Sequence, residues 1–432
     1  MAAPKTLSTE DYSHIVQQCL GANDFKIICC EERKLSEEPM GLLGDHFSTT
    51  VTVQRGSEQC DIKFFVKTFP INENQVKLIE ETGAFKKEVI FYSVLVEELK
   101  SFNVLSEGLR ADNDEINNKT WLCRCYLARS DVLVLEDLTQ LGFFGFNPRD
   151  VLDFHHTTLI LQKLALFHAS SLILEEKQSE STGKTYRINE VHPELIKETF
   201  YVCKPNHPGE MLLEASVNAL IRTVKLLPVC KTPDIERNID EILSREARSI
   251  LELVKPSKKY RNVLCHADMW SNNILCRYGE NRNPIDAILV DFQLIRYSPP
   301  TQDIFNFLYL MTRRAFREAH LKEFLSVYYR TLSEELRLHH LDPEKILPWS
   351  ELLDSCEEQQ HYGRINAWHC LHFVTIDREV LKKIMMDSEL YQKVIGEKRA
   401  EIVCEQFQSD NVYRERMTEV LNEFLECHVL QK

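Results

Sequence analysis

The residues whose types and spacing can do chemistry lie in one stretch of the 432-residue chain. His266, Asp268 and Asn273 form an HxDxxxxN pattern, and the apolar run that follows it ends at Asp291, just before a phenylalanine. Phosphoryl transfer requires a carboxylate that orients the attacking hydroxyl group, and hard oxygen ligands that hold Mg²⁺ against the phosphates. The stretch therefore predicts a phosphoryl-transfer site.

These four side chains have separate predicted roles. Asp268 is predicted to accept the proton of the substrate hydroxyl, and His266 is predicted to be a further catalytic residue beside it. The amide oxygen of Asn273 and the carboxylate of Asp291 are the predicted Mg²⁺ ligands. The alternative is an ordinary loop followed by a turn-capping aspartate, because HxDxxxxN alone occurs by chance in roughly one chain of this length in twenty. The apolar run into Asp291 at hairpin distance favours the catalytic interpretation.

A site of this kind also needs a lysine on a central strand and a helical glutamate that holds it. Lys67 ends the apolar run of the third predicted strand, and Glu88 follows on a predicted helix. Glu80 and Glu81 lie on the same stretch and remain alternatives to Glu88. Lys67 itself could be a strand-end lysine whose ammonium group reaches water.

Two further segments are placed to contact a nucleotide. Gly41 and Gly44 lie in the loop between the first two predicted strands, where backbone amides could approach phosphates, although a plain turn fits as well. The apolar run LVLEDL contains Glu136 and ends at Leu138. Its backbone would hydrogen-bond to adenine, although as a bare sequence it is only a buried strand with an acidic end.

The elements that must position these residues divide the chain into a sheet-forming and a helical half. Strands are expected where β-branched and aromatic residues cluster, and helices where apolar residues recur every three or four positions. The expected strands are 24–31, 47–54, 60–69 and 132–138, followed by helices over 72–99, 149–176 and from 232 onward. The fold class is therefore α+β, with an amino-terminal lobe over 1–136 and a helical lobe over 137–432 that contains a catalytic hairpin at 262–293.

Composition excludes several functional classes. The chain has 52 Lys plus Arg against 66 Asp plus Glu, a net charge of −14, so no global positive field attracts nucleic acid. No export signal or membrane-spanning run is recognised, so we expect a cytoplasmic protein without membrane association. The 14 cysteines include no CxxC pair and are expected to be mostly buried thiols. No protein partner can be inferred.

Seven segments together resemble a known family. They are FFVKTFP with Lys67, KKEVIFY with Glu88, LVLEDL, LALFHASS, LCHADMWSNNIL, VDFQ and SPPTQDIFNFL. In this order they look like the ecdysteroid kinase-like family, the arthropod-enriched branch of the choline kinase and aminoglycoside phosphotransferase superfamily. The resemblance implies a protein-kinase-like bilobal fold, ATP and Mg²⁺ as cofactors, and a hydroxylated small molecule as acceptor, with ecdysteroids the named substrates. It also favours Glu88 over its neighbours.

Some details of the family pattern differ or concern supporting residues. Ala267 stands where the family usually has glycine, which removes no ligand. Asp303 resembles a family aspartate that braces the catalytic loop. Phe143, Phe144 and Trp368 are candidate lining residues of a substrate pocket. The histidine pairs of the chain lack zinc-site spacing, so no structural metal is expected.

Three other functions remain possible at this stage. A choline or ethanolamine kinase would share the same motifs. A protein Ser/Thr kinase is disfavoured, because the chain has no GxGxxG loop and no recognisable APE segment after Asp291. Only about ten residues separate Asp291 from the PTQD segment at 300–303, too few for a peptide-binding activation segment. A pseudokinase acting as a binding module is disfavoured because Lys67, Asp268, Asn273 and Asp291 are all retained.

Overall fold

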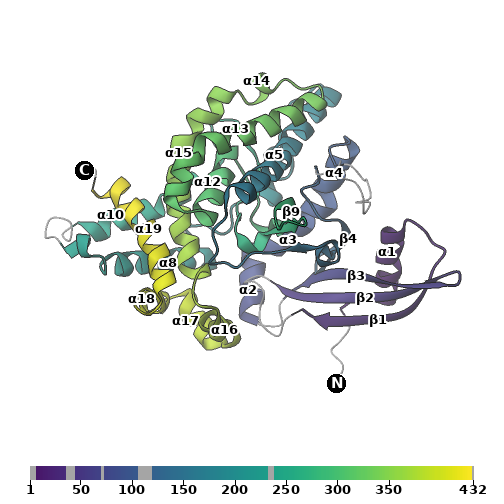
Figure 1. Ribbon diagram of the computed structural model, residues 1–432, viewed down its shortest axis with the longest axis horizontal. Coiled ribbons are helices and arrows are strands. Elements are labelled where there is room, and N and C mark those ends of the chain that lie inside the picture. Colours follow the sequence, from purple (N-terminus) through teal and green to yellow (C-terminus); the bar gives the residue numbers. More distant parts are fainter. Residues whose placement is uncertain (1–5, 36–43, 70–72, 106–118, 232–237, 431–432) are drawn as a thin grey trace.

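The amino-terminal half folds around an antiparallel sheet, seen at the lower right of Figure 1. The computed structural model describes residues 6–35, 44–69, 73–105, 119–231 and 238–430. The five strands run in the order β1-β2-β3-β5-β4. Their bounds are β1 Lys26–Lys34, β2 Asp45–Arg55, β3 Glu58–Thr68, β4 Cys125–Arg129 and β5 Val132–Glu136. Gly56, at φ +62°, makes the tight turn between β2 and β3 that the sequence predicts.

The two faces of this sheet bury different side chains. Helix α1, Thr9–Leu20, begins with a capping box at Ser8 and covers one face. Val53, Phe64 and Val66 pack beneath it in a separate apolar cluster. Because successive side chains on a strand point to opposite faces, Lys67 lies on the other face, toward the helical part of the molecule.

The stretch expected to be one long helix over 72–99 is broken into short segments. Their bounds are α2 Glu73–Thr82, α3 Ala84–Ile90, a π-helical turn Phe91–Leu95 and α4 Val96–Ser101. Gly83 has φ +63° and separates α2 from α3, because a left-handed residue cannot continue a helix. The break allows α3 to lie at an angle of its own between the sheet and the helical part (Figure 1).

Helix α5, Phe154–Thr182, forms the centre of the helical part. It begins later than the expected 149, because the Asp153 side chain caps its first turn. Among the described residues it is the one helix whose length and apolar composition would suit a membrane span, contrary to the expectation that no such run exists. Its most apolar window is 89% buried inside the protein, as in a core helix.

The predicted catalytic hairpin folds as part of two small sheets beside α5. The strand pairs are β6 Phe143–Phe144 with β8 Ile274–Tyr278, β8 with β9 Pro284–Leu289, and β7 Val263–Cys265 with β10 Arg296–Ser298. The loop between β7 and β8 and the loop between β9 and β10 therefore lie next to each other. The first loop contains Asp268 and Asn273, and the second contains Asp291.

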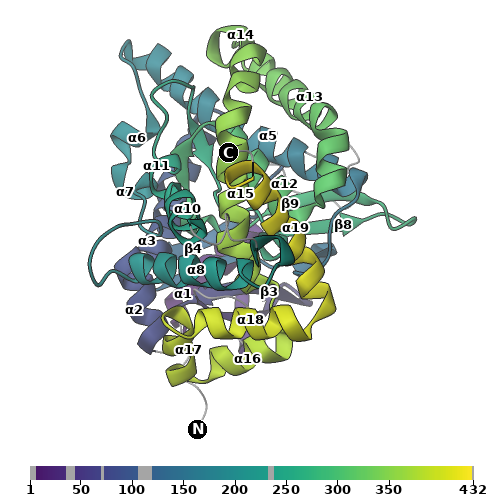
Figure 2. The same ribbon diagram turned by 90° about the vertical axis from the view of Figure 1, so that its left-hand side faces the viewer.

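Helices complete the remainder of the chain. Their bounds are α6 Ile188–Val191, α7 Pro193–Ile196, α8 Pro208–Val224, α10 Ile239–Arg248, α11 Ile250–Leu253, α12 Pro300–Met311, α13 Arg314–Leu338, α14 Pro343–Ile346, α15 Trp349–Val374, α16 Arg378–Met386, α17 Ser388–Ile395, α18 Arg399–Ser409 and α19 Asn411–His428. Short 3₁₀ turns occur at Leu138–Leu141, Pro228–Lys231, Ser271–Asn273 and Phe292–Leu294. Helices α8 and α18 lie side by side in the lower part of Figure 2.

The fold class is thus the expected one, an antiparallel sheet followed by a mostly helical part. The expected helix start at 232 lies outside the described residues, as does Gly41. The 14 cysteines are free thiols, but only Cys123, Cys230, Cys265 and Cys276 are buried, so the expectation of mostly buried thiols is wrong.

Candidate active site

Lys67 connects the sheet to both of its predicted acidic neighbours. Its Nζ donates to Glu88 Oε2 at 2.7 Å and to Asp291 Oδ1 at 3.0 Å. The lysine and glutamate are 4% and 1% exposed, so this is a buried ion pair. Burial alone would lower the pKa of Lys67, but the Asp291 and Glu88 carboxylates outweigh it and raise the pKa. The ammonium group is therefore charged and fixed in place.

Glu88 also binds the loop that contains Asp291. Its second oxygen accepts a hydrogen bond from the Phe292 N–H at 3.2 Å, so one carboxylate joins β3, α3 and this loop. The Phe292 ring stacks on Phe91 with centroids 4.1 Å apart, and Trp121 packs edge-on against it. Asp291 has φ +68°, a left-handed conformation that aims its carboxylate back toward Lys67. The apolar packing of Phe292 holds that conformation.

Asp268 lies in the adjacent loop, half-buried and in contact with Asn273. The Asn273 side-chain amide donates to the Asp268 carboxylate at 2.7 Å and to its backbone carbonyl at 2.9 Å. The Trp270 indole N–H donates to the same carboxylate at 3.3 Å. Burial, followed by repulsion from Asp291, raises the pKa of Asp268 to about 7. A carboxylate with a pKa raised toward neutrality is suited to accept a proton.

The loop before Asp268 is held by a fully buried aspartate. Asp303, in the first turn of α12, accepts hydrogen bonds from the backbone N–H groups of His266 at 2.5 Å and Ala267 at 2.8 Å. Ala267 has φ +67°, which explains why a glycine suits this position and why the alanine needs bracing. The neighbouring Asn306 accepts from Met269 N–H at 3.2 Å.

His266 is a buried bracing residue in this structure. Its Nε2 lies 2.9 Å from the Val290 carbonyl oxygen, next to Asp291. Burial lowers its pKa, so the ring is neutral and donates to this carbonyl. His266 thereby fastens the loop of Asp268 to the strand that leads to Asp291. No atom of its ring is exposed enough to reach a substrate, since the residue is 0% exposed.

The residues predicted to bind Mg²⁺ offer suitable oxygen atoms. Asn273 uses its amide nitrogen on Asp268, which leaves the amide oxygen available among the described contacts. Asp291 uses one oxygen on Lys67 and keeps its side chain 34% exposed. The Val290 N–H donates to the Asn273 carbonyl at 3.0 Å, which keeps the two segments adjacent. An amide oxygen and a carboxylate oxygen on adjacent segments are ligand types that fit a hard divalent cation.

Residues expected to contact the nucleotide lie on or beside three neighbouring strands, β2, β3 and β5. Gly44 precedes β2, and a Cβ there would meet the Thr68 carbonyl at 3.2 Å and the Lys67 side chain at 3.4 Å. His46 pairs directly with Lys67 across the strands, so both side chains are on one face. Glu136 ends β5, and Leu138 opens the connecting 3₁₀ turn. Gly44 and His46 thus lie beside Lys67, whereas Glu136 pairs with Phe64, three residues away along β3. Their roles remain predictions.

The predicted pocket-lining aromatic residues lie elsewhere. Phe143 and Trp368 are 0% exposed core residues, and the Trp368 indole donates to the Ser216 carbonyl at 3.1 Å. They cannot line an open pocket, so that prediction is wrong for both. Phe144 is 57% exposed. His168, Cys265 and Asp303 form a buried group with metal-ligand chemistry, but the two oxygens of Asp303 are already used by backbone N–H groups.

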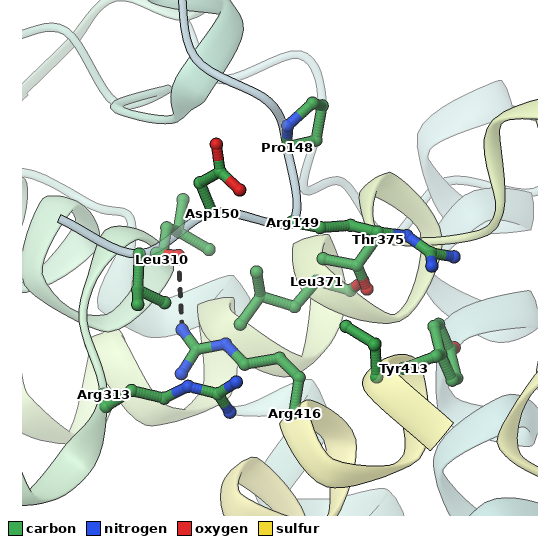
Figure 3. Close-up of a pocket in the computed structure, with 11 residues that line it drawn as sticks. Pro148, Arg149, Asp150, Leu310, Arg313, Leu371, Thr375, Tyr413 and Arg416 are labelled. Atoms are coloured by element: carbon green, nitrogen blue, oxygen red, sulfur yellow. Dashed lines mark hydrogen bonds between the residues drawn. The ribbon is translucent and has the colours of Figure 1, made fainter. Parts of the chain in front are cut away.

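A surface pocket on the helical part is separate from these residues. Figure 3 shows it between the segment around Arg149, the end of α12, and helices α15 and α19. Arg416 lies along its wall and donates to the Leu310 carbonyl at 3.2 Å, the dashed line in Figure 3. No predicted catalytic residue lines this pocket.

The sequence did not indicate several residues that support the site. Asn306, Tyr362 and Arg296 form a buried chain of hydrogen bonds from the Ala267 carbonyl to Glu198. Lys87, next to Glu88, binds two backbone carbonyls of the helical part. In the sequence these are only polar or charged residues among apolar ones. Such a pattern does not identify a hydrogen-bond partner that lies far away along the chain.

Three comparisons describe the similarity of this chain to known proteins. The model of the ecdysteroid kinase-like family matches residues 43–341. A 4-hydroxytryptamine kinase from Psilocybe cyanescens is 35% identical over 86 residues, which are 17% of this chain and 24% of that protein. A microcompartment-associated aminopropanol kinase aligns over 93% of this chain and 98% of its own, with 14% identity and a TM-score of 0.31. A choline/ethanolamine kinase family protein from Mesorhizobium loti aligns over 91% and 92%, with 11% identity and a TM-score of 0.32.

Proposed function

From its match to the family model, the chain belongs to the ecdysteroid kinase-like family, and we propose that it transfers the terminal phosphate of ATP to a hydroxyl group of a small molecule. The observation that carries the proposal is the convergence of two loops and a strand. Lys67, Glu88 and Asp291 form one buried cluster, and Asp268 with Asn273 lies beside it. These are the parts that phosphoryl transfer requires.

The chain's own residues have distinct tasks in this reaction. Lys67, fixed by Glu88, holds the nucleotide phosphates, and its charge is set before the nucleotide arrives. Asp268 accepts a hydrogen bond from the acceptor hydroxyl and takes its proton as the oxygen attacks the phosphorus. Asn273 fixes the Asp268 carboxylate through its amide N–H. His266 and Asp303 hold the loop that carries Asp268.

The amide oxygen of Asn273 and the free oxygen of Asp291 would hold Mg²⁺ with the nucleotide. The bound cation supplies charge neutralisation at the phosphate oxygens. On the nucleotide side, Gly44 permits close approach of the backbone to Lys67, and the backbone at Glu136 and Leu138, at the start of the connecting turn, would hydrogen-bond to adenine.

For the acceptor we propose a neutral, largely apolar alcohol such as a hydroxylated sterol. Choline recognition needs an acidic or aromatic cage for a cation. Of the two charged groups that act on Asp268, Asp291 is already paired with Lys67, and Arg296 is a cation that would repel choline. The printed name of the Psilocybe cyanescens relative gives a second acceptor class, hydroxylated aromatic amines.

A side-by-side acceptor screen tests the function. Purified protein with MgATP is offered ecdysteroids, other hydroxylated sterols, 4-hydroxytryptamine, choline and ethanolamine, and products are identified by the mass gain of one phosphate group. We expect a sterol to be phosphorylated at least about tenfold more efficiently, by kcat/KM, than choline, a difference of about 1.4 kcal/mol. Preference for choline would contradict the acceptor class. MgATP binding without any transfer would favour a pseudokinase.

A further inference from the structure

Lys87 is a buried lysine that the reaction as described does not use. It lies on α3 directly before Glu88 and is 4% exposed. Its Nζ donates to the backbone carbonyl of Lys197 at 2.8 Å and to that of Ile295 at 2.9 Å. Within the described part of the chain it makes no ion pair. The side chain of a surface-type residue thus crosses from the amino-terminal part into the helical part.

This arrangement is unfavourable for a lysine considered alone. Burial lowers the pKa of Lys87 to about 8, and the positive charge of Arg296 opposes the attraction of Glu198. A buried ammonium group held only by neutral carbonyls is rare, because removing it from water costs free energy that a hydrophobic residue would not. Leucine or methionine would fill the same space without that cost. The two hydrogen bonds of Lys87 therefore provide what an apolar side chain could not, a directional attachment of α3 to the helical part.

The two carbonyls belong to segments that converge on the site. Ile295 follows Asp291 by four residues and precedes β10. Lys197 directly follows α7 and precedes Glu198, the partner of Arg296. Through Arg296, Tyr362 and Asn306 this second segment reaches the loop of Asp268.

Helix α3 is therefore attached to the helical part at two consecutive residues. Glu88 binds the Phe292 N–H, and Lys87 binds the Ile295 carbonyl, three residues farther along the same loop. Glu88 accepts a hydrogen bond from the loop, and Lys87 donates one to it. The two contacts together fix the position and the orientation of α3 against the loop. Glu88 in turn positions the ammonium group of Lys67.

Building on the proposed function, we propose that Lys87 is a positioning residue that locks α3, and with it Glu88 and Lys67, in the phosphate-binding arrangement before any nucleotide binds. In this chain the helix that carries Glu88 is a fixed part of the catalytic unit. The lysine acts through Glu88 and does not contact the reacting atoms.

The same helix provides a matched control. Lys86 precedes Lys87, has a side chain that is 68% exposed, and pairs loosely with Glu194 at 3.6 Å. Lys87→Met and Lys86→Met are compared in the full chain, using ATP hydrolysis without acceptor, MgADP affinity by calorimetry, and hydrogen exchange of residues 83–90. We expect Lys87→Met to remain folded, to lose at least about tenfold in turnover, and to exchange at least about tenfold faster in α3. Lys86→Met should match the wild type.

A double-mutant cycle separates positioning from stability. In a Glu88→Gln background, Lys87→Met should cause little further loss of turnover, because the group through which it acts is already removed. Equal losses in both backgrounds, or wild-type exchange and turnover in Lys87→Met, would overturn the proposal. So would loss of the whole fold in both Lys87→Met and Lys87→Gln. If the wild type phosphorylates no acceptor in the screen, the proposed function fails, while hydrogen exchange still decides whether Lys87 locks α3.

Discussion

Replacing Asp303 by asparagine tests how the catalytic loop is held. In the wild type the carboxylate accepts hydrogen bonds from the His266 and Ala267 N–H groups and lies 3.2 Å from the ring of His168. Asparagine keeps one oxygen and replaces the other with an NH₂ group that faces a backbone donor. One hydrogen bond to a charged acceptor is lost, and one buried N–H is left unsatisfied.

The size of the effect follows from these contacts. A hydrogen bond to a charged group contributes about 1.5 to 3 kcal/mol, and an unsatisfied buried donor costs about 1 to 3 kcal/mol. We therefore expect the free energy of unfolding to fall by roughly 3 kcal/mol. The bracing also maintains φ +67° at Ala267, a conformation that costs an alanine about 1 kcal/mol. A loosened Ala267 displaces Asp268, so turnover per folded molecule should fall on the order of tenfold to a hundredfold.

Urea unfolding and ATP turnover, measured on the same preparations, give both quantities. The control is Asp286→Asn, which breaks a buried ion pair with Lys163 at 2.7 Å, away from the loop of Asp268. The control should lose stability without a comparable loss of turnover per folded molecule. If Asp303→Asn kept wild-type turnover, or lost no more than Asp286→Asn did, Asp303 would not position Asp268.

Three further outcomes are expected. Asp291→Ala removes the predicted Mg²⁺ ligand and a partner of Lys67, so calorimetry should show weaker MgATP binding together with lower turnover. Unchanged affinity and turnover would exclude Asp291 as a Mg²⁺ ligand. His46 lies opposite Lys67 on the same face of the sheet, so we expect its ring to contact the nucleotide phosphates. His46→Ala should then lower MgATP affinity about threefold to tenfold and leave adenosine affinity unchanged. Equal losses for both ligands would exclude the phosphate contact. Between pH 8 and 10, folded Lys87, with its pKa near 8, binds fewer protons than an unfolded lysine with a pKa near 10.4. The contribution of Lys87 to stability should therefore rise with pH, and the wild type should gain on the order of 1 kcal/mol over Lys87→Met from pH 7 to 9 in urea unfolding. A flat difference would mean that Lys87 has an ordinary pKa.

The parts of the fold that the sequence predicts are those fixed by local patterns. The strands around Lys67 follow from clustered β-branched and aromatic residues, and the catalytic hairpin follows from short apolar runs with turns between them. The pairing of Lys67 with Glu88 required the family resemblance, because Glu80 and Glu81 were equally helical candidates.

Other features depend on contacts that no local pattern contains. Lys87 reaches carbonyls 110 and 208 residues away, and a lysine in a helix is ordinarily a surface residue. Phe143 and Trp368 are buried, although their types suit a pocket equally well. Gly83 breaks the expected long helix through its left-handed conformation, and an isolated glycine in a helical pattern does not require such a break.

The most direct test of a phosphoryl-transfer site built around Asp268 is mass spectrometry of acceptor mixtures incubated with MgATP and either the wild type or Asp268→Asn. The variant keeps the side chain's shape and removes the carboxylate that takes the hydroxyl proton. We expect phosphorylated product from the wild type, and a loss on the order of 10² to 10⁴ in rate for the variant with MgATP affinity retained. Equal product formation by both proteins would contradict the assignment of Asp268 and the mechanism built on it.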